Sequence, residues 1–306
     1  MKNISHYLVI RKIEIEAANT ISSPLTYGFP AITGFLGAIH ALNRKLDEAG
    51  FQVKLPGVLI ACHGIYIQRF RPHAFADYSF NQSRNPVKKD GNTASIIEEG
   101  KVNLTVSLIV EVSTALRSSA TLSDDSDEFE QLCKTSLLQQ RMAGGSVRSI
   151  QSVQLKERSE ATELWKRLLP ASVLMDASKD LIEITQSLQK DNPEATALDG
   201  LIEVATLHHE PVDTSINKNG WQTRSVKTGR GWLVPMPVGY QSITPQFPPG
   251  ELAHCRNQEY PSQYVETLYG LGKWVFPNRL PEEISRCFWR YQQENNLFLV
   301  NQNQIG

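Results

Sequence analysis

The fold is decided by the stretch Val102-Asn103-Leu104-Thr105-Val106-Ser107-Leu108-Ile109-Val110-Glu111-Val112. Its content of Val, Ile, Leu and Thr is typical of a β-strand. Residues 58–70 predict a second strand immediately before it in the order of elements. Residues 4–16 predict an earlier strand, in which a shift of apolar parity indicates a bulge. Apolar residues at helical spacing over 31–48, ended by Gly50, predict a helix between these strands.

The same alternation of elements continues after Val112. Acidic residues at the start and an apolar stripe predict a helix over 127–142, which Gly144 and Gly145 are expected to end. Residues 147–155 then predict a fourth strand. The order β-α-β-β-α-β is that of the split βαβ, ferredoxin-like sandwich, so the first half predicts an α+β fold of this kind.

The second half is less regular. Residues 159–206 contain three short helical patterns, which predict a helical insertion. Residues 221–240 return to short strands, with Pro235 and Pro237 favouring a sheet edge, and 282–300 predict a helix followed by a short apolar run. We therefore divide the chain into a core at 1–155 that includes a hairpin at 71–100, a helical insertion at 156–212, and edge strands with a C-terminal extension at 213–306.

The hairpin carries the most distinctive sequence, Asn81-Gln82-Ser83-Arg84-Asn85-Pro86-Val87-Lys88-Lys89-Asp90-Gly91. Its turn dipeptides predict a projecting finger, here called the thumb (71–100), with Arg84, Lys88 and Lys89 near the tip and the acidic Glu98 and Glu99 near the base. Such a finger suits phosphates. From charge alone, an ordinary solvated hairpin is the commoner explanation, because charged hairpins are frequent on protein surfaces.

Two further loops have the chemistry of anion sites. In Arg141-Met142-Ala143-Gly144-Gly145-Ser146, paired glycines expose N–H groups and allow close approach of another chain, although a plain helix C-cap explains them as well. Ser22-Ser23-Pro24 precedes the first helix, where hydroxyls and helix-start amides bind an anion or simply cap the helix.

The bulk composition restricts the class of protein. The 306 residues have a net charge of −1, which argues against a protein that coats nucleic acid everywhere and permits one with a local basic patch. Four scattered cysteines without a CxxC pair, no signal peptide and no apolar run of about 20 residues predict a cytoplasmic protein outside membranes.

Residues 214–250 carry four cations and no acid around Trp221 and Trp232. This pattern favours either an RNA groove or buried tryptophans beside a solvated loop.

Enzymatic signals are weak. His208-His209-Glu210 lacks the spacing of a metal site, and Cys62-His63 lies within one strand, where adjacent side chains point to opposite faces. The third glycine of a dinucleotide loop, the Walker sequence and the GxSxG elbow are all missing. We expect no metal and no cofactor. The stacking aromatics of an RNA-recognition motif are missing from 102–112, so any RNA is expected on loops and the thumb rather than across the sheet.

The chain resembles one family, the Csy-two (Cas-five-f) subunit of type I-F CRISPR surveillance complexes. The resemblance is carried by the thumb sequence, residues 21–30 and residues 141–146 together. Further matches at 231–235 and 266–272 extend the likeness from Ile21 through Trp274. The resemblance implies a fold of the RAMP superfamily and a non-catalytic subunit that grips the 5′ handle of the crRNA. It implies that Gly144, Gly145 and Ser146 touch RNA while Arg141 pairs with a phosphate.

The resemblance also implies the partners. These are the large subunit (Cas-eight-f type), the first backbone subunit (Cas-seven-f type) at which the thumb folds over the RNA, and target DNA through the assembled complex. The predicted RNA-binding residues are Ser22, Ser23, Arg84, Asn85, Lys88, Lys89, Arg141, Gly144, Gly145, Ser146 and Arg148.

Two alternatives remain open. One is a RAMP-type endoribonuclease that processes repeat RNA, with His40 or a neighbouring tyrosine as the base that deprotonates a 2′-hydroxyl. The other is a protein-interaction module in which the basic thumb docks on an acidic partner.

Overall fold

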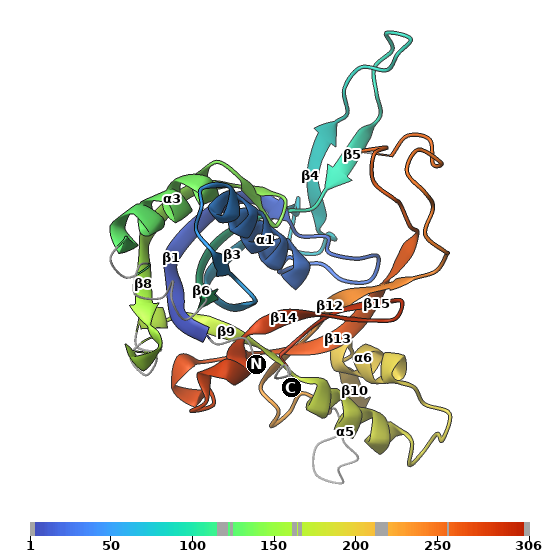
Figure 1. Ribbon diagram of the computed structural model, residues 1–306. Coiled ribbons are helices and arrows are strands. Elements are labelled where there is room, and N and C mark those ends of the chain that lie inside the picture. Colours follow the sequence, from blue (N-terminus) through green and yellow to red (C-terminus); the bar gives the residue numbers. More distant parts are fainter. Residues whose placement is uncertain are drawn as a thin grey trace.

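The computed structural model describes residues 4–114, 122, 125–160, 164, 167–211, 220–255 and 257–302. Within these ranges the chain forms a mixed α+β structure with four α-helices, a 13-stranded antiparallel sheet and a separate two-stranded sheet (Figure 1).

The first half contains all six predicted elements in the predicted order. Helix α3 ends at Leu138, earlier than expected, and its last residue is followed by Gln139 as the C-cap. The elements are β1 (Ile4–Asn19), α1 (Ile32–Glu48), β3 (Gly57–Phe70), β6 (Lys101–Thr114), α3 (Ser126–Leu138) and β8 (Gly145–Glu157).

The four long strands lie side by side in the order β8-β1-β6-β3, and every pairing is antiparallel. The predicted bulge in β1 is confirmed, because the register with β6 shifts between Ile10 and Ile13 and Lys12 has a φ of 45°. A short strand, β2 (Val53–Lys54), pairs with the end of β6.

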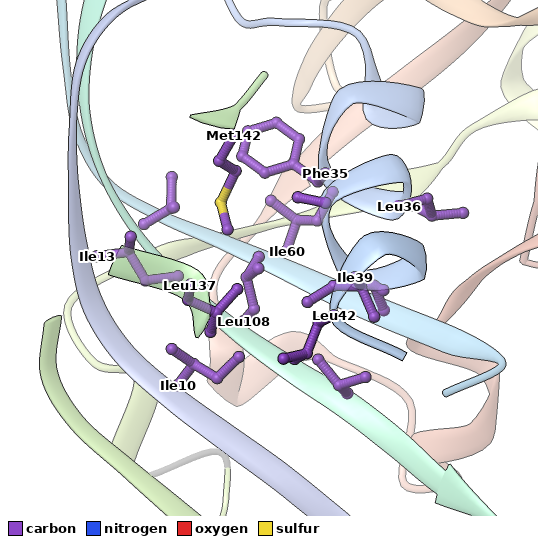
Figure 2. Packing of buried hydrophobic residues seen from close by; sticks show 14 of the residues in the cluster. Ile10, Ile13, Phe35, Leu36, Ile39, Leu42, Ile60, Leu108, Leu137 and Met142 are labelled. Atoms are coloured by element: carbon purple, nitrogen blue, oxygen red, sulfur yellow. The ribbon is translucent and has the colours of Figure 1, made fainter. Parts of the chain in front are cut away.

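One face of this sheet is covered by the two helices. Phe35, Ile39 and Leu42 of α1 point toward Ile10 and Leu108 on the strands, and all five are essentially inaccessible to water (Figure 2). Each such side chain contributes about 1.5–3 kcal/mol on burial. The periodicity that predicted α1 therefore marks the face that packs on the sheet.

The opposite face of the sheet is covered over part of its length. Tyr7 and Leu59 pack there with Leu168 and Phe288, and the rings of Tyr7 and Phe288 stack 5.5 Å apart. The remaining part of this face, toward the thumb, has exposed polar residues and is described below.

Residues 156–212 contain helices at the second and third predicted helical patterns, and also strands that were not predicted. Strand β9 (Ser172–Asp176) pairs with β3 on one side and β13 on the other. Helices α5 (Ser178–Leu188) and α6 (Ala197–Ala205) follow, and the 3-10 turn η1 (Arg158–Glu160) precedes them. Strands β10 (His208–Pro211) and β11 (Trp221–Arg224) form the two-stranded sheet.

The predicted helix within 282–300 is also wrong, because this segment forms a hairpin of β14 (Trp289–Glu294) and β15 (Leu297–Asn301). The hairpin joins the large sheet through β12 (Trp232–Ser242), which pairs with β13 (Val265–Val275). Short 3-10 turns, η2 (Pro277–Arg279) and η3 (Ile284–Cys287), precede it. Asn295-Asn296, with Asn295 at a φ of 52°, forms the two-residue turn.

The C-terminal hairpin is fixed to β9 and β6 by buried polar contacts. The indole of Trp289 donates to the carbonyl of Leu174 at 2.9 Å. The guanidinium of Arg290 forms a bidentate pair with the carboxylate of Glu111 on β6, with Nε to Oε2 at 2.8 Å, and both side chains are buried. Gly57 lies against Glu111, where a Cβ would be only 2.2 Å from the carboxylate oxygen.

Candidate nucleic-acid interface

The thumb is a hairpin of β4 (Ser79–Arg84) and β5 (Ile96–Glu99) that extends from the ends of β3 and β6. Arg69 and Phe70 of β3 pair with Phe80 and Ser79 of β4, and β5 leads through Gly100 into β6. The hairpin therefore continues long core strands, and Figure 1 shows it projecting away from the body of the molecule.

The thumb tip presents cations without carboxylate partners. Arg84, Lys88 and Lys89 are exposed, and none of them forms an ion pair among the residues that the structure describes. A turn closed by Gly91 N–H on the Lys88 carbonyl, at 2.9 Å, fixes the tip. The carboxylate of Asp90 accepts hydrogen bonds from the backbone and side chain of Asn92, which lower its pKa.

The acidic residues at the thumb base have partners within the hairpin. Glu98 accepts the N–H of Phe80 at 3.0 Å, and Glu99 lies 3.6 Å from the ammonium of Lys101. The separation of positive tip and acidic base that the sequence predicted is therefore present, and a phosphate at the tip meets cations that are not already neutralised.

The thumb base is attached to the loop between β1 and α1. The N–H of Thr20 donates to the Gly100 carbonyl at 3.1 Å, and a Cβ at Gly100 would be 2.4 Å from the side chain of Ile21. The rings of Tyr27 and Phe80 meet edge to face at 5.5 Å. Gly100 is thus required by the close packing of the thumb on this loop.

Ser22 and Ser23 lie within the same loop, and their hydroxyls make local bonds. Ser23 Oγ accepts the N–H of Thr26 at 3.0 Å and that of Leu25 at 3.2 Å, and its side chain is buried. Ser22 Oγ lies 3.2 Å from Thr26 Oγ1. These bonds shape the loop, and the predicted contacts of both serines with RNA stay predictions.

The paired glycines close a β-hairpin, so the prediction that they end a helix is wrong. Strand β7 (Arg141–Met142) pairs with β8, and Ala143 and Gly144 form the turn with φ values of 49° and 80°. Positive φ at both central residues is the geometry of a type I′ turn, which matches the twist of the flanking strands. Arg141, Gly144 and Ser146 are exposed on this hairpin, and Gly145 is buried.

This glycine hairpin, residues 141–146, packs against the end of β1 and the start of α1. The Ala143 carbonyl accepts the N–H of Asn19 at 2.9 Å, and a Cβ on Gly34 would lie 2.9 Å from the Cα of Ala143. A Cβ on Gly145 would be 2.7 Å from the backbone of Ala18. Gly34, within the first turn of α1, is a contributor that the sequence analysis missed, although a glycine in a helix is itself a signal of close approach.

The three predicted segments therefore meet at one dipeptide. Asn19 is bonded to the glycine hairpin, and the adjacent Thr20 is bonded to the base of the thumb. The structure brings together the β1–α1 loop, the glycine hairpin and the thumb base. It places Asn85, Lys88 and Lys89 farther out on the thumb, beyond the β4–β5 ladder.

Arg148 lies on a different surface from these loops. It is exposed on β8, between the buried Val147 and Ile150, and its Nε is 3.3 Å from Glu16 Oε2. The two residues border a shallow hollow on the open face of the sheet, whose lining includes Glu14, Tyr66 and Thr105. Acidic side chains on this face disfavour phosphate, and the expectation that RNA does not lie across the sheet stays a prediction.

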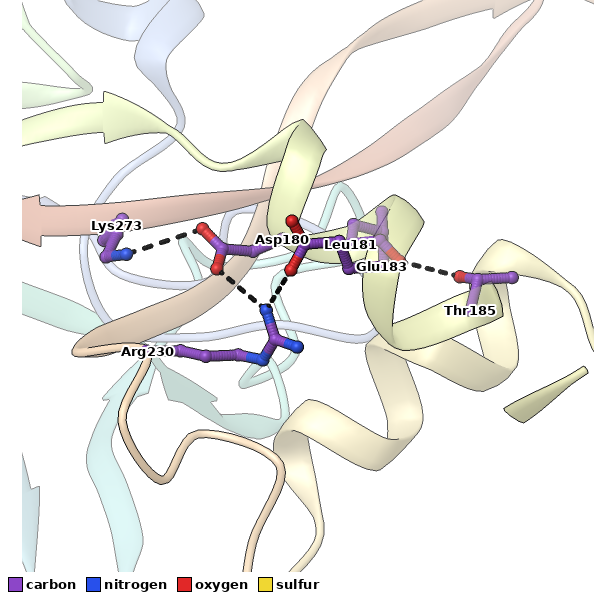
Figure 3. A network of polar contacts seen from close by, with 6 residues as sticks. All are labelled: Asp180, Leu181, Glu183, Thr185, Arg230 and Lys273. Carbon is purple, nitrogen blue, oxygen red and sulfur yellow. Dashed lines mark hydrogen bonds and ion pairs between the residues drawn. The ribbon is translucent and has the colours of Figure 1, made fainter. Parts of the chain in front are cut away.

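Two of the three described cations in the basic segment of the second half, Arg224 and Arg230, are paired with carboxylates of the chain, whereas Lys227 forms no ion pair among the described residues. Arg224 pairs with Glu210 at 2.9 Å, and Arg230 pairs with Asp180 and Glu183 at 3.3 and 2.6 Å (Figure 3). The first of these pairs lies across β10 and β11, and the second fixes α5. Lys218 lies outside the described residues. Trp221 and Trp232 are 69% and 66% exposed, so the expectation of buried core tryptophans is wrong.

The histidines and Cys62 have structural contacts. His208 Nε2 is 2.7 Å from Glu203, and His209 Nδ1 is 3.2 Å from Thr223. No group of three metal-ligating side chains occurs in the described part of the chain. Burial raises the pKa of the Cys62 thiol to about 11, so it is protonated at neutral pH. His63 is the extra residue of a bulge in β3, with its Nε2 2.7 Å from Ser107 Oγ.

None of the helices in the described residues combines the length and the apolar run that a bilayer crossing needs.

Two comparisons relate the chain to known proteins. A family model described as CRISPR-associated protein (Cas_Csy2) matches residues 8–300. A protein of Pseudomonas aeruginosa (strain UCBPP-PA14) named CRISPR-associated protein Csy2 is 33% identical over 308 residues, covering 94% of this chain and 91% of that protein. The family match therefore begins before Ile21 and ends after Trp274, which are the limits of the motifs recognised in the sequence.

Proposed function

Because this chain belongs to the Csy2 family of type I-F CRISPR-associated proteins, we propose that it binds the 5′ handle of the crRNA. In this proposal it acts as a non-catalytic subunit of the RNA-guided surveillance complex in the cytoplasm, and it caps one end of the backbone filament. Its contribution is positional, since contacts to phosphates fix the geometry of the RNA and a few base contacts fix its register.

We infer that the core is a ferredoxin-like fold of the RAMP superfamily. The inference is supported by the strand order β8-β1-β6-β3, in which β1 and β3 flank β6 while β6 and β8 flank β1. The placement of α1 and α3 in one cluster with the same face of the sheet agrees with it. The thumb is then an insertion between the second and third core strands.

The observation that carries the RNA-binding proposal is the meeting of three family-matched segments at Asn19 and Thr20. The thumb places unpaired cations at one end of this surface. The glycine hairpin supplies exposed backbone at Gly144 and an exposed Arg141 at the other. A single-stranded RNA segment that passes between them meets positive charge at the thumb and exposed protein backbone at the glycine hairpin. Recognition of an RNA backbone uses this combination.

The proposed partners follow from the family. The large subunit (Cas-eight-f type) pairs with this protein at the 5′ end of the crRNA, and the thumb folds over the RNA at the first backbone subunit (Cas-seven-f type). Target DNA is reached through the assembled complex by pairing with the guide.

The endoribonuclease alternative is disfavoured by the position of His40. This histidine is exposed on α1, six residues after Gly34, which contacts the glycine hairpin. Six residues turn a helix by roughly 240°, so the two residues project in different directions. A base that acts beside the glycine hairpin therefore has to come from another residue, such as Tyr27 in the adjoining loop.

Binding of crRNA with an intact or a trimmed 5′ handle to this chain and its large partner, across a salt series, tests the proposal. We expect tight binding that needs the handle, that weakens by about 0.7 log units per log unit of salt for each neutralised phosphate, and that leaves the RNA whole. Binding independent of the handle would reduce the protein to a scaffold. Shortened RNA in the same samples, abolished by His40→Ala or Tyr27→Phe, would establish the nuclease alternative.

A further inference from the structure

A cluster of arginine and aromatic side chains lies at the base of the thumb, where β3 turns into β4. The guanidinium carbon of Arg69 is 4.1 Å from the centre of the Tyr78 ring, and that of Arg71 is 4.7 Å from it. We call Arg69, Arg71 and Tyr78 the arginine–tyrosine cluster. The predicted set of RNA-binding residues contains none of the three.

The two guanidinium groups in this cluster have no carboxylate partner among the residues that the structure describes. Neither Arg69 nor Arg71 forms an ion pair within the described ranges, and Asp77 is the single acid between residues 69 and 78. Two cations held on one ring repel each other, so an anion bound between them is stabilised. Because stacking already fixes the planar groups, little side-chain entropy is lost when their N–H edges bind a phosphate.

The cluster faces the same side as the β1–α1 loop. Arg69 is directly opposite Phe80 across the β3–β4 ladder, so the two side chains share a face, and the Phe80 ring contacts Tyr27 of the loop. The cluster is therefore continuous with the surface on which the glycine hairpin and the thumb base meet.

An uncovered aromatic ring occupies the same short loop. Phe75 is 97% exposed, and Tyr78 is 50% exposed despite the two arginines. A phenylalanine ring exposed to this extent offers a stacking surface that the described residues leave almost entirely uncovered. Unpaired bases are the nucleic-acid groups that use such a surface, whereas bases in a duplex are already stacked.

We propose that the arginine–tyrosine cluster and Phe75 form a binding site for an unpaired nucleotide of single-stranded RNA. One base stacks on Phe75 or on the guanidinium planes, and its flanking phosphate accepts hydrogen bonds from Arg69 and Arg71. This inference rests on the proposed function, because the RNA that reaches the thumb base is the handle held by the neighbouring loops.

The test measures the affinity of fluorescein-labelled handle RNA for the full chain co-purified with its large partner, across a salt series. Phe75→Leu is expected to weaken binding roughly 5- to 100-fold with an unchanged salt slope, as removal of one stacked base does. Arg69→Gln with Arg71→Gln is expected to lower the salt slope by about 0.7 for each phosphate that is no longer neutralised. Tyr78→Leu weakens binding, while Tyr78→Phe retains the ring under the arginines and restores it.

Matched controls separate this site from general effects. Phe276→Leu removes a half-exposed ring on another element, and Arg44→Gln removes an exposed cation on α1. Both are expected to bind RNA as the unaltered protein does. A 2-aminopurine base placed at successive handle positions should show quenching at one position that Phe75→Leu relieves.

Three outcomes overturn the inference, and they differ in what else they exclude. Unchanged RNA affinity in the Phe75 and arginine variants, with weakened binding in thumb-tip variants, rejects this site and leaves the proposed function intact. Unchanged RNA affinity with failure of the variants to co-purify with a protein subunit assigns the cluster to a protein contact. An unaltered protein that does not bind the handle rejects both the site and the proposed function.

Discussion

The thumb and the segment from β10 to β12 both place cations next to exposed aromatic rings, yet they differ in what surrounds the charge. On the thumb, Arg84, Lys88 and Lys89 have no carboxylate partner in the described residues. In the second segment, Arg224 and Arg230 are bound to carboxylates of the same chain. The number of positive charges is therefore a poor guide to a nucleic-acid site, and the number left unpaired after folding is a better one.

The largest expected effect is on RNA affinity. Replacing Arg84, Lys88 and Lys89 with alanine should weaken handle binding about 100-fold at 0.1 M salt and lower the salt slope by about 2, because about three phosphates are no longer neutralised. Replacing Arg224, Lys227 and Arg230 removes the same charge, and we expect a much smaller change because two of these three cations are already paired with carboxylates of the chain. Equal weakening in the two triple variants, measured by anisotropy, would break the comparison.

A second effect tests whether the thumb surface depends on the packing beneath it. Gly145→Ala should destabilise the protein by about 1–3 kcal/mol, since the added Cβ would be 2.7 Å from the backbone of Ala18 and Glu16. Gly37→Ala is the control, because no atom lies within 4 Å of its Cβ position, and it should stabilise α1 by up to about 1 kcal/mol. Urea unfolding of both variants measures the difference, and equal midpoints would contradict the packing argument.

A smaller effect is expected in the second segment. Arg230→Gln removes the partner of Asp180 and Glu183 on α5, while Lys273 remains 3.5 Å from Asp180. Partly exposed pairs of this kind contribute below about 1 kcal/mol, so global stability should change little. Amide hydrogen exchange should become faster in α5 and stay unchanged in β4 and β5. Faster exchange in the thumb would mean that the two regions are coupled.

The smallest effect concerns two acids whose pKa values are lowered for different reasons. Asp90 on the thumb owes its lowered pKa to hydrogen bonds from Asn92, and Glu210 owes it to the hydrogen bond and charge of Arg224. Carboxyl NMR titrations should show that 0.5 M salt raises the pKa of Glu210 and leaves that of Asp90 unchanged, since salt screens charges. Arg224→Gln and Asn92→Ala should each raise only the neighbouring pKa.

The sign of the linked stability follows from the lowered pKa of Glu210. Its contribution is present at pH values above the ordinary range of a glutamate carboxyl, and it is lost as the pH falls through the lower folded value. The Arg224→Gln variant should therefore differ from the unaltered protein at neutral pH and converge with it in acid. A difference that persists below the folded pKa would mean that the pair does not act through charge.

The elements of the first half were predictable because the apolar residues of each recur with one spacing, that of a helix or that of a strand. The stripe of α1 and the β-branched run of β6 each have a single buried pattern, and both formed as expected. Even the bulge near Lys12 left a parity shift in the sequence.

The C-terminal hairpin was not predictable from the spacing of its apolar residues alone. Trp289 and Phe288 fit a helix as well as a strand, and their burial depends on contacts with β9 and Tyr7 that lie far away in sequence. The Asn295-Asn296 turn was the local signal that favoured a hairpin. Strand β9 was missed for a related reason, since five residues between helices carry little periodicity.

The candidate site was predictable in its segments and less so in its geometry. The thumb, the serine loop and the glycine pair were recognised as sequence, but the backbone bonds of Asn19 and Thr20 that join them carry no side-chain signature. The partners of Arg230 were also hidden, because Asp180 and Glu183 lie about 50 residues earlier in the chain. Pairing across such distances is a property of the folded state.

The buried pair of Glu111 and Arg290 has a consequence for the order in which the protein matures during synthesis. Glu111 sits in the central strand β6, and a buried carboxylate without its partner costs several kcal/mol. Its partner, Arg290, is made 179 residues later. The strands of the first half are therefore complete before the residue that neutralises Glu111 is made, and the buried carboxylate has no Arg290 to pair with until β14 is synthesised.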